Sequence, residues 1–261
     1  MTMIIIIILA VLIIVGFSIY NYYLQSENGK HENGTVEEEK EDIKKDPKEE
    51  TGAINEQGEH YIIDVKYPIT ENEEINAVVD NLMQERADKV KLEAEEFFSG
   101  PNLPEALFSW KYSLYADYSV FHYSSNIVSF KFDMSEFKGG AHPSNSIVTK
   151  TFDREEGKEI SLSDIFRKDS DYLNALSEIS FQQLIQKFLA DENLKDGFDE
   201  SWVENGTSPS ENNFKNFVLA EDSIIFYFEQ YQVIAYAAGE QNVEIKYSQL
   251  TDILNPSIIN P

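Results

Sequence analysis

Residues 60–83 read HYIIDVKYPITENEEINAVVDNLM, and this stretch decides the fold class. Tyr61, Ile63 and Val65 alternate with charged residues at positions 64 and 66, which predicts a strand with one buried face. Residues 70–73, Thr-Glu-Asn-Glu, are typical of a helix N-terminus. Apolar residues then recur at helical spacing from Ile75 until Ser-Gly-Pro at 99–101, so a long helix follows the strand.

Three alternating stretches come after this helix, at residues 108–114, 128–134 and 148–152. Their short spacing predicts an antiparallel meander. A second helix is predicted over 173–188, then a long loop over 191–213, strands near 217–220, 223–230 and 243–247, and a helical turn near 248–254. Because strands and helices do not alternate regularly, we predict an α+β fold, with antiparallel sheets and a long helix in each of two closely packed subdomains.

The N-terminal segment has an apolar run over residues 3–20 and tyrosines at 20, 22 and 23. About 18 apolar residues beside an aromatic belt are near the minimum that spans a bilayer. No lysine or arginine precedes the run and no A-x-A site follows it, so we predict an uncleaved transmembrane anchor over 1–23. We expect a single-pass cell-membrane protein whose C-terminal part is extracytoplasmic, although Lys30 and Lys40 oppose this orientation.

Residues 24–58 are polar and acidic without an apolar period, and they predict a flexible linker. The remaining chain is divided into two predicted α+β modules, residues 59–135 and 136–261. Residues 60–261 hold 35 acidic and 16 basic side chains, a net charge of −19. Such a field repels nucleic acid and attracts cationic partners, although the acidity could serve solubility alone.

The usual catalytic and metal-binding patterns are incomplete. The chain has no cysteine, which excludes disulfides and thiolate chemistry. The segment TFDREEG at 151–157 is similar to part of the polysaccharide deacetylase motif, but no two of the four histidines are four residues apart, so the metal ligand set is lacking. The segment DENLKDG at 191–197 fails the calcium-loop pattern at two positions. We therefore predict no catalytic residue, metal or cofactor, and an enzyme is less expected than a binding protein.

Two segments supply candidate binding residues. The turn EFKGGAHPSN at 136–145 contains Gly139, Gly140 and His142, and its glycines permit positive φ. His142 could shape the turn, contact a partner or act in catalysis. Tyr231 and Tyr236 lie in YQVIAY, where they could anchor an interface or belong to the core of a sheet.

Three segments occur in a characteristic order: KGGAHPSNSIVTKTFD, EEGKEISLSDIF and FYFEQYQVIAYAAGEQNVEIKYSQLTDIL. Together they resemble the uncharacterised C-terminal domain of the RsiV-like, lysozyme-sensing anti-sigma factors. Residues 59–135 resemble the companion module that also occurs in peptidoglycan deacetylases. The resemblance implies a membrane-tethered, extracytoplasmic binding domain whose partner is a cationic protein such as lysozyme, or peptidoglycan.

The sequence departs from both relatives. Only Met1 and Thr2 precede the apolar run, so we expect no sigma-binding segment, and we expect no catalytic domain after the companion module. The first hypothesis is therefore a membrane-anchored binding module of the bacterial cell envelope. The alternative is a hydrolase acting on envelope polymers, with His142 and either Asp133 or Glu136 in acid and base roles.

Overall fold

The computed structural model describes residues 50–101, 104, 107, 109–195 and 197–259. The anchor predicted at 1–23, with its membrane span at 3–20, and most of the linker predicted at 24–58 lie outside the described residues. Among the residues that the structure describes, no helix has the length and apolar character that a bilayer span requires. All described residues belong to one compact unit, residues 43–261.

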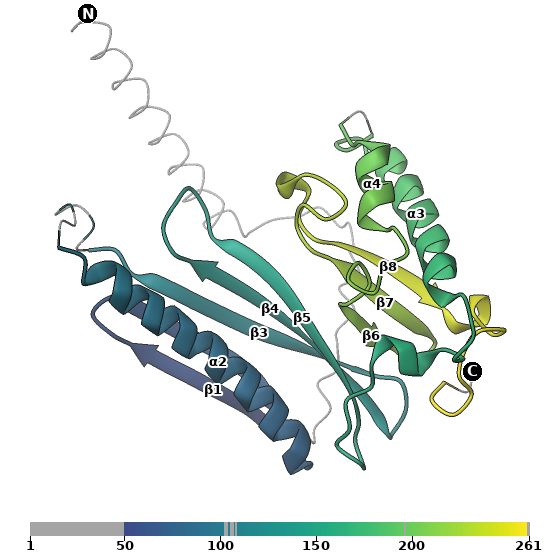
Figure 1. Cartoon of the computed structure of the whole chain (residues 1–261), viewed down its shortest axis with the longest axis horizontal. Helices are drawn as coiled ribbons and strands as arrows, with labels where there is room; N and C mark the ends of the chain where they lie inside the picture. The colour runs from purple at the N-terminus through teal and green to yellow at the C-terminus, as the bar shows by residue number, and fades with distance from the viewer. Residues whose placement is uncertain (1–49, 102–103, 105–106, 108, 196, 260–261) are drawn as a thin grey trace, which may run out of the picture. The chain divides into compact units, whose positions relative to one another are not determined.

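The first sheet has five strands in chain order. They are β1 (Glu50–Gln57), β2 (Tyr61–Ile69), β3 (Tyr112–His122), β4 (Ile127–Phe137) and β5 (Ser144–Asp153). The long helix α2 (Glu73–Phe98) connects β2 to β3 and lies along one face of this sheet (Figure 1). The predicted meander holds for β3, β4 and β5, whereas β2 and β3 are parallel. A crossover helix returns the chain to the end where β2 began, and this makes the pair parallel.

The helix α2 begins at the predicted place because Asn72 caps it. The Asn72 Oδ1 accepts hydrogen bonds from the backbone N–H of Glu74 at 2.9 Å and of Ile75 at 3.2 Å. The buried stripe of the helix then packs on the apolar face of β1 to β4 and forms the first core. This stripe consists of Ile75, Val79, Met83, Ala87, Val90 and Ala94.

The second module has a smaller antiparallel sheet of β6 (Phe217–Leu219), β7 (Ser223–Phe228) and β8 (Gln241–Lys246). The helix α3 (Tyr172–Ala190) buries Leu176, Leu184 and Phe188 against this sheet. A shorter helix, α4 (Glu200–Gly206), lies beside α3 (Figure 1). Short 3-10 helices occupy Leu162–Ile165, Tyr236–Ala238 and Tyr247–Gln249. The molecule is thus α+β, as predicted, with a mixed first sheet, antiparallel except for the β2–β3 pair, and an antiparallel second sheet.

The structure differs from the predictions in several ways. The strand predicted at 108–114 is β3, which begins at Tyr112 and ends at His122. Residues 50–57 were placed in the linker but form edge strand β1, in which Ile54 is buried and Gly52 leaves room for the ring of Tyr67. An edge strand with one exposed face contains many polar residues, so its sequence is difficult to distinguish from that of a polar linker. The helix α4 lies in the predicted loop at 191–213, and only Val203 and Gly206 of it are buried. The predicted module boundary at 135/136 falls inside β4, and β5 belongs to the same sheet.

Side-chain hydroxyls join the second module to the first sheet. Thr149 Oγ1 accepts a hydrogen bond from Phe217 N at 2.8 Å, and Ser129 Oγ accepts one from Leu219 N at 3.0 Å. Ser129 and Thr149 lie on the face of β4 and β5 that is opposite α2, because their neighbours Phe130 and Val148 pack toward the helix. The second module therefore covers the β4–β5 part of that face, while Asp64 on β2 stays exposed.

Candidate functional site

A cleft lies on the face of the first sheet opposite α2. Its volume is about 510 Å³, and strands β2 to β5 supply its floor. Ile63, Val65, Leu114 and Ala116 are in the core, so the alternating side chains between them point into the cleft. The lining residues are Asp64, Lys66, Tyr115, Ala116, Asp117, Asp133, Met134, Ser135, Asn145, Ser146, Ile147, Glu229, Gln230 and Glu240.

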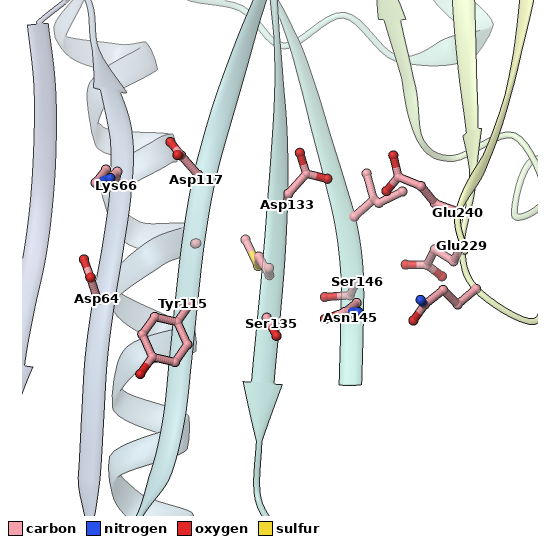
Figure 2. A pocket seen from close by; sticks show the side chains of 14 residues that line it. Asp64, Lys66, Tyr115, Asp117, Asp133, Ser135, Asn145, Ser146, Glu229 and Glu240 are labelled. Atoms are coloured by element: carbon pink, nitrogen blue, oxygen red, sulfur yellow. The ribbon is translucent and has the colours of Figure 1, made fainter. Parts of the chain in front are cut away.

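Strand register places two carboxylates directly opposite each other. Asp117 on β3 pairs in register with Asp133 on β4. Figure 2 shows the Asp117 side chain turned toward β2 and the Asp133 side chain turned toward β5, beyond which lie Glu229 and Glu240 from the segment after β7. Like charges at directly opposed positions disfavour strand pairing. The ammonium of Lys131 pairs with Asp133 and offsets part of this repulsion.

The cleft is negative overall, but its carboxylates differ in how they are paired. Five carboxylates line it, at residues 64, 117, 133, 229 and 240, against the single cation Lys66. Glu229 is 3.2 Å from the ammonium of Lys215. Among the described residues, Asp64 and Asp117 have no cationic nitrogen within ion-pair distance. These two carboxylates are free to pair with a ligand.

Lys131 is buried behind two of the cleft carboxylates, Asp133 and Glu240. Its side chain is only 9% exposed, and its ammonium pairs with Asp133 and, at 3.1 Å, with Glu240. It also lies 4.8 Å from the ring centroid of Tyr227. A buried cation needs such partners. Burial, followed by the charges of Glu240 and Asp133, raises the pKa of Tyr227 above its ordinary value.

The structure brings three of the predicted binding residues together. The ring of His142 stacks on that of Tyr236, with 4.2 Å between centroids, and Tyr231 is 5.5 Å from Tyr236. The Tyr236 hydroxyl lies 3.4 Å from the carbonyl oxygen of Pro143, across 93 residues of sequence. We call His142, Tyr231 and Tyr236 the aromatic cluster. It adjoins the cleft, since Gln230 and Asn145, close in sequence to these residues, line it.

The two tyrosines are not part of a sheet core. Residues 231–236 lie between β7 and β8, where Val233 and Ile234 are buried and Tyr231 is 56% exposed. Gly139 and Gly140 have φ of +94° and +104°, which glycine adopts without strain. They shape the turn that leads to His142. The Nδ1 of His142 lies 2.9 Å from the Pro143 carbonyl oxygen.

The residues of the catalytic alternative are not assembled into one site. Glu136 pairs with Arg86 of α2 at 3.5 Å and with Lys138 at 2.9 Å. It therefore lies toward the helix, whereas Asp133 lines the cleft on the other face. Among the described residues, the hydrogen bond of His142 is to a carbonyl and not to either carboxylate.

The two segments that resemble metal-binding motifs form turns. Asp153 Oδ1 accepts hydrogen bonds from the backbone N–H of Glu155 and Glu156, both at 2.9 Å. Asp191 Oδ1 accepts one from Asn193 N at 2.8 Å. Within the described ranges, no group of three or more histidine, aspartate or glutamate side chains could hold a metal ion.

The sequence alone did not single out Asp64, Lys66 or Asp117. Each occupies the polar side of an alternating strand, a position that usually only faces solvent. These three residues come together because β2 pairs in parallel with β3. The register places Asp64 beside Tyr115, and Lys66 follows the pair Val65–Ala116 by one position.

Comparison with known proteins identifies both modules. Residues 163–248 match the family "Protein of unknown function (DUF3298)", and residues 54–145 match the family "Deacetylase PdaC". A DUF3298 domain and a PdaC-type domain are therefore present, in agreement with the predicted combination of C-terminal domain and companion module. The relation to lysozyme-sensing anti-sigma factors stays a prediction.

One curated relative and two solved structures extend this comparison. The peptidoglycan-N-acetylmuramic acid deacetylase PdaC of Bacillus subtilis (strain 168) is 30% identical over 213 residues, which cover 81% of this chain but only 43% of the relative. A DUF3298 family structure from Bacteroides fragilis has a TM-score of 0.54 at 22% identity, covering 80% of this chain and 96% of that one. Another, from Pseudomonas aeruginosa PAO1, has a TM-score of 0.55 at 16% identity, covering 82% and 97%. These structures share the fold.

Proposed function

We propose that this chain, which carries a PdaC-type and a DUF3298 domain, is a membrane-anchored, extracytoplasmic binding module of the bacterial cell envelope. Its ligand is a cationic protein of the lysozyme kind, held at the acidic cleft. The similarity to a peptidoglycan deacetylase supports a place in the envelope. The apolar run over residues 3–20 supports the anchor.

The opposed pair Asp117 and Asp133 is the observation that carries this proposal. Because Lys131 already pairs with Asp133, the charge of Asp117 is the one that an ammonium or guanidinium group of a ligand would balance on binding. Glu240 and the unpaired Asp64 extend the negative surface on either side. The charge of the whole domain would then speed association, while the cleft selects the partner.

The aromatic cluster supplies the second element of a protein-binding surface. Tyrosines are enriched among the residues that contribute most to binding energy, and Tyr231 is among the most exposed large hydrophobic side chains of the described chain. An exposed aromatic group beside a cleft of carboxylates suits a partner that carries lysine and arginine side chains.

The full chain in a mild nonionic detergent can be titrated with a cationic lysozyme by calorimetry, at low and at physiological salt. We expect submicromolar affinity that survives physiological salt, because contacts inside a cleft are screened less than surface charges. Binding that disappears at physiological salt would show that the acidic surface attracts cationic proteins without a specific site, and this would contradict the proposal.

A hydrolase acting on envelope polymers is the second candidate, and the deacetylase similarity favours it. Incubation of the full chain with purified peptidoglycan, followed by assays for released acetate and new reducing ends, tests it. Turnover that is lost in His142→Ala at unchanged stability would establish the enzyme. No turnover in the unmodified protein would remove this candidate.

A further inference from the structure

The turn after β7 holds an exposed tyrosine in a left-handed backbone conformation. Tyr231 has a φ of +68°, and it is the one non-glycine residue with positive φ among the described residues. A bulky side chain adopts this conformation only where the surrounding structure enforces it. The ring is 56% exposed, so burial does not offset the strain. The conformation of Tyr231 is therefore not explained by a contribution of its side chain to the stability of the fold.

Several hydrogen bonds enforce this turn from outside it. Trp202 Nε1 of α4 donates to the Tyr231 carbonyl oxygen at 2.9 Å. Gln232 Nε2 donates to the carbonyl oxygens of Gly206 at 3.1 Å and Asn213 at 3.0 Å. Gln232 Oε1 accepts from Glu229 N at 3.1 Å. The turn is thus fixed on both sides of Tyr231.

The contact between α4 and the turn leaves no free space. A Cβ atom on Gly206 would lie 2.1 Å from the carbonyl oxygen of Gln232, so this position requires glycine. The helix α4 has only seven residues, and Val203 and Gly206 are its buried members. Its contribution to the core is therefore small compared with its contacts to the turn.

We propose that α4 is a positioning element and that Trp202 is the residue that holds Tyr231 ready for the partner. The ring of Tyr231, beside Tyr236 and His142, receives a lysine or arginine side chain of the bound protein on its face. Glu229, two residues earlier, lines the cleft and supplies negative charge nearby. Fixing the ring before binding lowers the entropy that association costs. This inference rests on the proposed function.

The strain is tested by comparing the melting temperatures of Tyr231→Gly and Tyr231→Ala in the full chain. Both variants remove the ring, but only glycine relieves the strain. We expect Tyr231→Gly to melt about 2–4 °C above Tyr231→Ala, the reverse of the order at ordinary backbone positions. A lower Tm for Tyr231→Gly would overturn the claim of strain.

The bracing is tested by Trp202→Phe, which keeps a ring but removes the N–H donor. We expect faster amide hydrogen exchange across residues 229–233, with exchange in β7 unchanged. For the cationic lysozyme probe at physiological salt, we expect binding to weaken about fivefold, as one lost hydrogen bond to the turn predicts. Unchanged exchange together with unchanged affinity would overturn the positioning role.

The Tyr231→Gly background separates positioning from a merely structural role. Once the ring is absent, adding Trp202→Phe should change affinity less than about twofold, because the two residues act through one contact. An equal loss in both backgrounds would contradict the inference. If the unmodified chain binds no cationic protein, the proposed function fails together with the contact role of Tyr231, while exchange and Tm still decide the bracing by Trp202.

Discussion

Asn72 links the start of α2 to the turn after β5, which is distant from it in sequence. Its Oδ1 caps α2, and its Nδ2 donates to the carbonyl oxygens of Arg154 at 3.1 Å and Glu155 at 3.3 Å. The turn after β5 approaches so closely that a Cβ on Gly157 would lie 2.7 Å from the Asn72 Oδ1. The segment TFDREEG thus has a structural role, which its sequence alone did not reveal.

We therefore expect Asn72→Ala to lower the free energy of unfolding by about 1–3 kcal/mol, since the cap and the cross-chain bonds are both lost. Urea denaturation measures this change. The matched control is Asn81→Ala, at an exposed position of the same helix, where a change within about 0.5 kcal/mol is expected. Equal losses for both variants would contradict the role given to Asn72.

Asp164 makes a pH-dependent contribution near the start of the second module. Its Oδ2 accepts hydrogen bonds from the hydroxyl of Ser161 at 2.6 Å and from the backbone N–H of Ser161 at 2.9 Å. These bonds, the hydroxyl first, lower the pKa of Asp164 below its ordinary value of 3.8. Because the folded state lowers the pKa, the ionised carboxylate stabilises the protein above that value, and the contribution is lost as pH falls through the folded-state pKa.

Asp164→Ala should accordingly lower Tm at neutral pH and have a smaller effect at about pH 3, where the carboxylate of the wild type is increasingly protonated. Thermal melts of both proteins across this range measure the difference. A Tm difference that is constant or grows toward acid pH would show that the hydrogen bonds of Asp164 do not depend on its charge.

At the scale of elements, periodicity predicted the parts with strong local patterns. The helix α2 and strands β2, β4 and β7 follow from apolar spacing and a cap. The strand β1 and helix α4 could not be predicted in this way, because each buries only two residues or so against the rest of the chain. Parallel pairing of β2 with β3 depends on how α2 docks, which local spacing does not specify.

The candidate site was less predictable than the fold because it is assembled across elements. His142 is recognisable in the sequence as a rare residue in a Gly-Gly turn. Its stacking on Tyr236 is not, because that contact joins segments that are distant in sequence. The pair Asp117 and Asp133 exists only once the register of β3 and β4 is fixed. In the sequence, both aspartates read as ordinary solvent-facing residues of a strand.

The opposed carboxylates give a prediction for the pairing of β3 and β4. Asp117→Asn should raise the free energy of unfolding by about 0.2–1 kcal/mol, because repulsion from Asp133 is removed while the amide oxygen can still accept the hydrogen bond from Tyr118 N. Chemical denaturation at low salt measures it. Asp64→Asn is the control, since Asp64 lies opposite Tyr115 and should change stability little. Destabilisation by Asp117→Asn would contradict the repulsion.

At the scale of the whole molecule, the cleft results from how the second module sits on the first sheet. Hydroxyl contacts from Ser129 and Thr149 hold β6 on the β4–β5 part of the face, and the segment between β7 and β8 brings Glu229 and Glu240 to the edge of the cleft. Lys131 ties Glu240 to Asp133 across this junction. Each module contributes acidic groups that neither would assemble alone.

The net charge of −26 gives every exposed carboxylate some attraction for a cationic protein. A test of the site must therefore hold the charge change constant. Glu85 and Glu95 lie on the exposed side of α2, on the opposite face of the first sheet from the cleft. Replacing both with glutamine removes as much charge as replacing Asp64 and Asp117, the cleft carboxylates without an ion pair among the described residues, with asparagine.

The most direct measurement is the affinity of the full chain for a cationic lysozyme at physiological salt, compared between Asp64→Asn/Asp117→Asn and Glu85→Gln/Glu95→Gln. If the cleft is the binding site, the aspartate pair should weaken binding by about tenfold or more, as loss of buried charge contacts does, while the glutamate pair changes it less than about twofold. Equal weakening by both pairs would show attraction without a site and contradict the proposed function.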